Sequence, residues 1–138
     1  MTLFAFTDGA CRGNPGESGI GIILKSQEGT TVSLLGEYIG KATNNSAEYR
    51  ALLRCLALAR QLGCTRLIVH SDSELMVKQL QGLYRVKHAG LKRLFTQAQA
   101  ALKEAPYSFE IRHVDRSLNA EADDLANRAI NLRGTIDS

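Results

Sequence analysis

The spacing of apolar residues changes after about residue 40, and this change most limits the folds open to the chain. Three closely spaced apolar segments come first, and we expect strands at residues 2–7, 19–25 and 31–39. The turn Gln27-Glu28-Gly29 joins the last two, as in an antiparallel hairpin. Helical patterns and short apolar runs then alternate. The pattern predicts an α/β domain.

The rest of the chain supplies four helical patterns and two more strands. We expect a helix between Asn45, as its N-cap, and Gly63, and a buried parallel strand at residues 66–71. Further segments are helices at 73–82, 91–103 and 119–130 and a strand at 107–114. The resulting order is βββαβααβα, a five-stranded mixed sheet flanked by helices. We expect one domain at residues 1–133 and a frayed tail at 134–138.

The composition fits an ordinary globular domain. The 138 residues are 44% apolar and 22% charged, and no apolar run reaches the roughly 20 residues of a membrane span. The first residues do not form a signal peptide. An odd number of cysteines, three, indicates free thiols and a cytoplasmic location. We expect a monomer with no membrane association, and no protein partner is evident.

The stretch FTDGACRGNPGESGIGI places Asp8 at the end of the first expected strand. Aspartate before glycine is common in turns, so Asp8 has a structural explanation. A metal ligand held on a strand is the alternative. The stretch is not a nucleotide-binding P-loop, because no Gly-Lys-Ser/Thr follows it.

A second carboxylate, Glu48, heads an apolar stripe on the first helix. Leu52, Cys55, Ala59 and Leu62 continue this stripe, so Glu48 faces the protein body rather than water. If Asn45 is the N-cap, Glu48 occupies the third helical position and could complete a capping box.

Two further acids stand at comparable places. Asp72 follows the strand at 66–71, where α/β sheets usually bind ligands, although it could also cap the next helix. In the last helix, Asp123 falls at the edge of the apolar face, with Asn119 one turn before it, and Asp124 falls nearly opposite. Helix geometry therefore nominates Asp123.

If these four acids converge, their repulsion must be relieved. Two charges about 4 Å apart at an effective dielectric constant near 20 repel by about 4 kcal/mol. Hard carboxylate oxygens suit Mg²⁺ or Mn²⁺, and no zinc-type spacing of cysteines and histidines is present. Apart from these four, ten acidic residues stand against 17 basic ones. The remaining surface therefore suits a polyanionic partner.

Four segments carry a resemblance to a known family. TDGACRGNPGESGIG, TNNSAEYRAL, VHSDSELMVKQL and NAEADDLA resemble, in order, the motifs of type 1 ribonuclease H, in the short archaeal and bacterial form that lacks a basic protrusion. The resemblance implies a ribonuclease H-like fold and an endoribonuclease that hydrolyses the RNA strand of RNA/DNA hybrids. It implies two Mg²⁺ or Mn²⁺ ions and products with 5′-phosphate and 3′-hydroxyl ends.

The resemblance also assigns residues. It implies that Asp8, Glu48, Asp72 and Asp123 are the catalytic and metal-binding carboxylates. The side-chain amides of Asn14, Asn44 and Asn45 would hydrogen-bond to 2′-hydroxyl groups and base edges in the minor groove of the hybrid. The residues expected to contact the hybrid are Gly9, Cys11, Asn14, Gly16, Asn44, Asn45, Arg85, Lys87, Arg116 and Asn119.

The chain departs from the family pattern at two places. It has no tryptophan, and only LYRVKHAGLKR stands where many members carry the basic protrusion that grips the DNA strand. We therefore expect weaker binding of the hybrid, which would depend on Arg85, Lys87, Lys92 and Arg93. The loop before the last helix has no histidine; Arg116 is the candidate phosphate contact there. His113 alternates with strand residues, and His70 is interpreted as structural.

Other interpretations remain open from the sequence. A hybrid-binding module without catalysis would keep the same fold. A DNA-cutting nuclease or integrase would also use carboxylates and metal ions. A small-molecule α/β enzyme is disfavoured, because no nucleotide-binding fingerprint is present.

Overall fold

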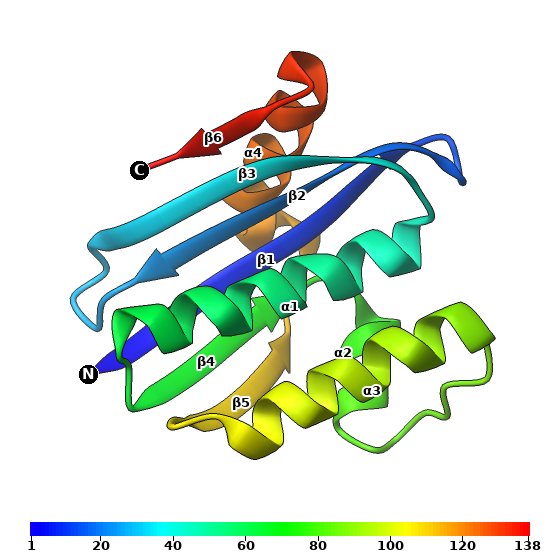
Figure 1. The fold of residues 1–138 in the computed structure, drawn as a ribbon. Helices are drawn as coiled ribbons and strands as arrows, with labels where there is room; N and C mark the ends of the chain where they lie inside the picture. Colours follow the sequence, from blue (N-terminus) through cyan, green and yellow to red (C-terminus); the bar gives the residue numbers. More distant parts are fainter.

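The chain forms one mixed β-sheet with helices on both faces, as Figure 1 shows in a computed structural model that describes all 138 residues. The strand order is β5-β4-β1-β2-β3-β6. The strands are β1 (Thr2–Arg12), β2 (Gly16–Lys25), β3 (Thr31–Ala42), β4 (Arg66–Ser71), β5 (Ser108–His113) and β6 (Thr135–Asp137). The helices are α1 (Asn44–Leu62), α2 (Glu74–Leu80), α3 (Ala89–Glu104) and α4 (Ala120–Leu132), with a short 3-10 helix at Arg116–Asn119.

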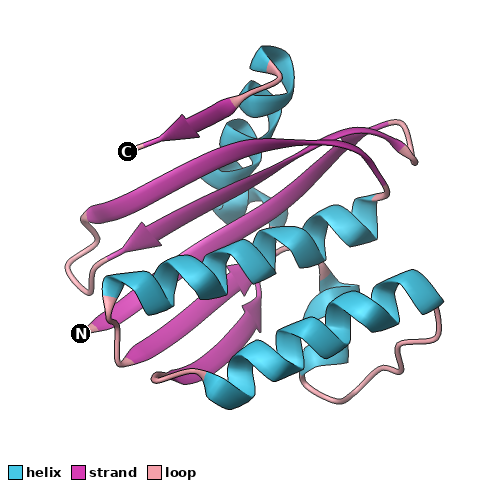
Figure 2. Cartoon of the chain, in the orientation of Figure 1, coloured by secondary structure: helices cyan, strands magenta, loops and turns pink.

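The sheet divides into an antiparallel and a parallel half. β1, β2, β3 and β6 pair antiparallel, while β4 and β5 add in parallel on the other side of β1. Helices α1 and α3 lie over the near face of the sheet in Figure 2, and α4 lies behind it. This is the α/β fold class predicted from the sequence. No helix combines the length and apolar composition that a membrane crossing requires.

Two strands differ from the sequence prediction. β1 does not end near Asp8 but runs on to Arg12, because its pairing with β2 continues as far as Glu17. The sheet also has six strands rather than five. The sixth, β6, lies in residues expected to fray, and it pairs with Leu35 to Glu37 at the edge of β3. The glycine-rich segment is therefore mostly strand, with its turn confined to residues 13–15.

The main core lies between α1 and the sheet. Leu52, Cys55 and Ala59 of the predicted stripe are fully buried on α1, against Leu3 and Ala5 of β1, whereas its last member, Leu62, is 38% exposed at the end of the helix. The helix starts earlier than predicted: Thr43, not Asn45, is its N-cap, and it forms a capping box with Ser46. The left-handed C-cap at Gly63 ends it as expected.

On the other face, α4 lies directly on the backbone of β2 and β3. A methyl group added at Gly21 would overlap the carbonyl oxygen of Ala122, and one at Gly36 would approach that of Leu125. The buried side of α4 consists largely of small residues, among them Ala122 and Ala126. This close approach fixes the position of α4, and therefore of Asp123, relative to β1.

We therefore expect Gly21→Ala to destabilise the protein by about 1–3 kcal/mol, because the added methyl group forces α4 or β2 to shift. The measurement is the midpoint of urea unfolding. Gly134→Ala is the matched control, since its added methyl group would lie 3.7 Å from the nearest atom, an ordinary contact. Equal midpoints for the two variants would contradict this account of the packing.

Candidate active site

A polar cavity of about 440 Å³ opens where β1, the end of β4, the first turns of α1 and the start of α4 come together. All four predicted carboxylates, Asp8, Glu48, Asp72 and Asp123, line it. They come from β1, α1, α4 and the residue that follows β4, positions that span most of the sequence. The fold thus brings together four acids that are far apart in the sequence.

Asp8 lies inside β1 rather than at its end. It pairs with Gly21 of β2, and only 5% of its surface is exposed. The turn explanation for this residue is therefore wrong, because the chain is still extended here. At Asp8 the strand is held by its ladder with β2, whereas the pairing of β1 with β4 ends one residue earlier, at Thr7. The backbone position of Asp8 therefore has little freedom to adjust.

Glu48 is held by the strand beside it. Its Oε1 atom accepts a 2.8 Å hydrogen bond from the backbone N–H of Gly9. The capping-box explanation for Glu48 is wrong, since Ser46 occupies that role in α1. Gly9 is essential to this contact, because a side chain there would overlap the backbone of Ala47 and Glu48. The glycine lets the helix approach the strand closely.

Asp72 follows the last residue of β4. The N-cap of α2 is Ser73, whose hydroxyl accepts from the backbone N–H of Met76 at 3.3 Å. Asp72 is therefore not needed as a cap, and it faces the cavity. Carboxylate oxygens of Asp8, Glu48 and Asp72 lie within 4.8 Å of one another.

Asp123 and Asp124 take the places that helix geometry predicts. Asp123 lines the cavity, and its Oδ1 atom accepts a 3.2 Å hydrogen bond from the Asn127 amide. Asp124 points away and forms an exposed ion pair with Arg128 at 3.7 Å. Only Asp123 therefore joins the cluster.

The pKa values of the two most buried carboxyls, Asp8 and Glu48, are raised by burial and by repulsion from neighbouring acids. Burial is the main cause for Asp8, whose pKa rises to about 10, and repulsion from Glu48 adds to it. Burial likewise raises the pKa of Glu48 to about 8, followed by repulsion from Asp72. The hydrogen bond from Gly9 and the charge of Arg116 oppose the rise at Glu48. The cluster therefore lacks positive charge to balance its carboxylates.

The donor set fits a hard divalent cation. The convergent oxygens all come from carboxylates, which are the ligands that Mg²⁺ and Mn²⁺ prefer. The cavity also has room beside the acids for water or phosphate oxygens, and Mg²⁺ usually retains such ligands. The residues present therefore fit the metal site that the sequence predicted.

Some of the predicted substrate contacts lie in the same cavity. Gly9, Cys11, Asn44, Asn45 and Arg116 line it beside the acids. Sequence reasoning missed Asn127, which lies four residues after Asp123 and hydrogen-bonds to it. The helical spacing of four was the available signal. Arg12 also reaches this corner and donates to the backbone oxygen of Asn127 at 3.2 Å.

Other predicted contacts lie apart from the cavity. Asn119 is 1% exposed, and its amide donates to the Thr7 carbonyl at 2.8 Å, so it joins the 3-10 helix to β1 instead. Gly16, Arg85 and Lys87 do not line the cavity. Gly16 begins β2, and the two cations lie in the segment between α2 and α3.

Two hollows continue the cavity along α1. The first, of about 250 Å³, shares Asn45 with the cavity and is lined also by Asn14, Thr43 and His88. Asn14 accepts a 3.0 Å hydrogen bond from the backbone of Asn44, which ties the turn to the helix.

We call the second the basic hollow. It measures about 570 Å³, and its basic residues are Lys41, Arg50, His88 and Arg93. Of these, only His88 and Arg93 belong to the segment in which the sequence indicated basic contacts.

The two histidines singled out in the sequence have other surroundings. His70 is structural as predicted: its ring stacks on Phe6 at 4.5 Å, and its Nδ1 atom lies 2.9 Å from the Ala5 carbonyl oxygen. His113 is the last residue of β5 and does not line the cavity.

The sequence and the fold match those of known proteins over nearly the whole chain. The family model described as reverse transcriptase-like matches residues 6–129. The crystal structure of the ribonuclease H1 called LC11, in complex with an RNA/DNA hybrid, superposes with a TM-score of 0.91 at 38% identity. That match covers 95% of this chain and 98% of the other.

Two curated relatives are longer than this chain. Ribonuclease HI of Halobacterium salinarum is 40% identical over 93% of this chain and 64% of its own length. A bifunctional protein of Mycobacterium tuberculosis is 42% identical over 94% of this chain and 36% of its own length. The chain thus spans about two thirds of one relative and about a third of the other. On its sequence, its fold and these matches, the chain belongs to the type 1 ribonuclease H family.

Proposed function

We propose that the chain is an endonuclease that hydrolyses the RNA strand of RNA/DNA hybrids and leaves 5′-phosphate and 3′-hydroxyl ends. One observation carries the proposal: carboxylate oxygens of Asp8, Glu48 and Asp72 lie within 4.8 Å of one another. They line a polar cavity in which metal ions could bind the phosphate of a nucleic acid. The relationship to ribonuclease H1 proteins supports the choice of substrate. The three free cysteines favour action in a reducing compartment such as the cytoplasm.

In this proposal the four carboxylates hold two Mg²⁺ or Mn²⁺ ions. Asp8 is positioned by the pairing of its strand with β2. Glu48 is oriented by Gly9 and Asp123 by Asn127. When bound, the ions neutralise the cluster, polarise the scissile phosphate and lower the pKa of water.

The other lining residues position the substrate. Asn44 and Asn45 lie at the exposed start of α1, where their amides can donate to and accept from 2′-hydroxyl groups and base edges. Arg116 lies close enough to Glu48 for its charge to lower the pKa of that carboxyl, so it can also meet a phosphate at the metal site. The basic hollow would carry backbone phosphates farther along the duplex.

The proposal is tested by incubating a strand-labelled RNA/DNA hybrid with Mg²⁺, with Mn²⁺ and with chelator. We expect metal-dependent loss of the RNA strand alone, with RNA/RNA and single-stranded RNA left intact. Binding without cleavage in every lane would favour the hybrid-binding module. Cleavage of a DNA strand would favour the DNA-cutting nuclease.

The two adjacent aspartates of α4 provide a matched pair of variants. We expect Asp123→Asn to reduce the cleavage rate at least about 100-fold, because it removes a charge from the metal site. Asp124→Asn should stay within about twofold of the parent protein, since an exposed pair such as Asp124–Arg128 contributes little. The reverse ranking in a steady-state assay would overturn the assignment to Asp123.

The raised pKa values predict how stability depends on pH without metal. For both Asp8 and Glu48 the folded-state pKa lies above the unfolded value near 4, so the folded state binds more protons above that pH. Stability should therefore fall as pH rises from about 4 toward 8. The melting temperature of metal-free protein should be higher at pH 5.5 than at pH 8, and Mg²⁺ should raise it more at pH 8.

The variant Asp8→Asn separates this effect from the other titrating groups. It should stabilise the metal-free protein at pH 8 by about 1–3 kcal/mol and reduce the difference between the two pH values. Asp124→Asn serves as the control and should keep the full difference. An unchanged difference in Asp8→Asn would show that the cluster is not its source.

A further inference from the structure

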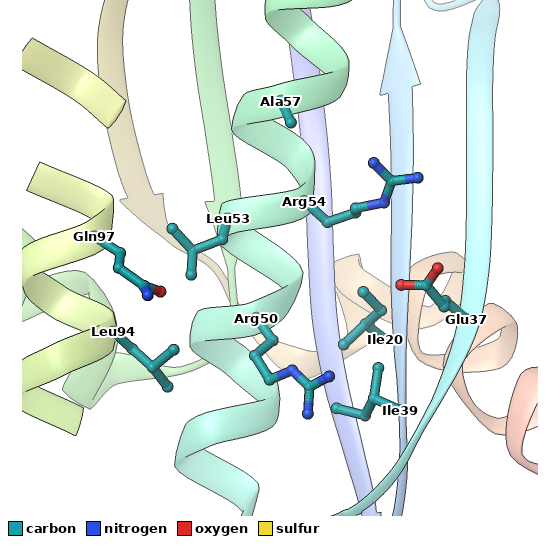
Figure 3. A pocket seen from close by; sticks show the side chains of 9 residues that line it. All are labelled: Ile20, Glu37, Ile39, Arg50, Leu53, Arg54, Ala57, Leu94 and Gln97. Carbon is teal, nitrogen blue, oxygen red and sulfur yellow. The ribbon is translucent and has the colours of Figure 1, made fainter. Parts of the chain in front are cut away.

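A groove crosses the outer surface of α1, beyond the basic hollow. Figure 3 shows its side chains, with α1 in the middle, Leu94 and Gln97 of α3 on one side and residues of β2 and β3 on the other. Its volume is about 330 Å³. We call it the outer groove, and none of the residues predicted to bind the hybrid lines it.

The outer groove is connected to the active site by two hollows that share lining residues with their neighbours. It shares Arg50 and Leu94 with the basic hollow. The basic hollow in turn shares Thr43 and His88 with the hollow at Asn14, which shares Asn45 with the catalytic cavity. The hollow at Asn14 and the basic hollow therefore lie in turn between the catalytic cavity and the outer groove.

The cations of this path are not neutralised within the protein. Arg50 and Arg54 stand four residues apart on α1, a spacing at which like charges destabilise a helix. None of the six ion pairs of the structure includes Arg50, Arg54, Lys41 or Arg93. The outer groove contains one acid, Glu37 of β3. Such a row of unpaired cations is complementary to a phosphate backbone.

The floor of the outer groove is apolar. Ile39, Leu53 and Leu94 are partly buried there and leave part of their surface open. Sugars and base faces can pack on these apolar side chains on either side of α1, while phosphates meet the arginines that α1 places between them. The volume is at the small end of ligand pockets, which suits one unpaired strand rather than a duplex.

We propose that the outer groove binds a single-stranded nucleic-acid tail that extends from the hybrid held in the catalytic cavity. Arg50 and Arg54 contact the phosphates of the tail, and Ile39, Leu53 and Leu94 contact its sugars or bases. This inference rests on the proposed function, because the hybrid delivers the tail to the groove. It extends the substrate from a duplex to a duplex with a single-stranded flank.

The test compares the binding of blunt and tailed hybrids by fluorescence anisotropy, with chelator present so that nothing is cleaved. DNA and RNA tails are tested at each end, which identifies the strand that occupies the groove. We expect at least one tailed hybrid to bind the unaltered protein about fivefold or more tightly than the blunt hybrid. Equal binding of all tailed and blunt hybrids would overturn the proposal.

Variants then assign the effect to the groove. In the double variant Arg50→Ala with Arg54→Ala the advantage of the tail should disappear. The slope of log affinity against log salt for the tailed hybrid should fall by about 0.7 for each cation removed. Arg60→Ala, on the same helix but outside the groove, should retain the advantage. Glu37→Gln should increase it. An advantage that persists in the double variant would refute the assignment.

The two proposals can fail separately. If no hybrid is cleaved with Mg²⁺ or Mn²⁺, hydrolysis is refuted, while the anisotropy measurement still reports whether the tail binds. If the blunt hybrid is cleaved but a tail adds no affinity, the proposed function stands and the role of the outer groove is refuted.

Discussion

Repulsion among carboxylates held in one cavity is the constraint on which the rest of the structure depends. Asp8 is held in place by the pairing of β1 with β2, and Glu48 is tied to Gly9 by a hydrogen bond. Arg116 is the one cation whose charge lowers the pKa of Glu48. Charge balance must therefore come from outside the chain, which is why the cavity suits metal ions and a phosphate backbone.

Glycine makes this arrangement possible at two contacts between a helix and the sheet. At Gly9 the absence of a side chain lets the start of α1 approach β1, so that Glu48 reaches the strand backbone. At Gly21 it lets α4 lie on β2, which brings Asp123 toward Asp8. For the same glycine-rich stretch, the resemblance implied contacts with the hybrid at Gly9 and Gly16. In the structure it serves first to pack helices, and only residues near 13–15 form a turn.

Local patterns predicted the order of elements well, because apolar periodicity reports directly which face of a segment is buried. The stripe on α1 and the outward direction of Asp124 followed from helix geometry alone. The ends of strands are harder to predict from local sequence, because they depend on pairing with residues far away along the chain. The extension of β1 past Asp8 depends on β2, and β6 depends on the edge of β3. The true cap of α1 was missed because Thr43 and Asn45 are both good capping residues.

The candidate site was predictable where residue type carries the chemistry, as for the four carboxylates. The site was less predictable where the role of a residue depends on its position in the folded chain rather than on its type. Asn119 looked like a substrate contact but is used inside the fold, whereas Asn127 and Lys41 gained their places from tertiary contacts. No local pattern shows this for Asn119 and Lys41, whereas the spacing of four between Asp123 and Asn127 was a usable signal.

The wide spread of the carboxylates along the chain also has a kinetic consequence. Asp8 lies in the first strand and Asp123 in the last helix, so the cavity cannot form until nearly the whole chain has come together. Contacts so distant in sequence form late and slowly during folding. Metal ions that need the complete cluster would bind only the finished fold, so they would slow its unfolding without guiding its assembly. The appearance of tight metal binding would then mark the last step of folding.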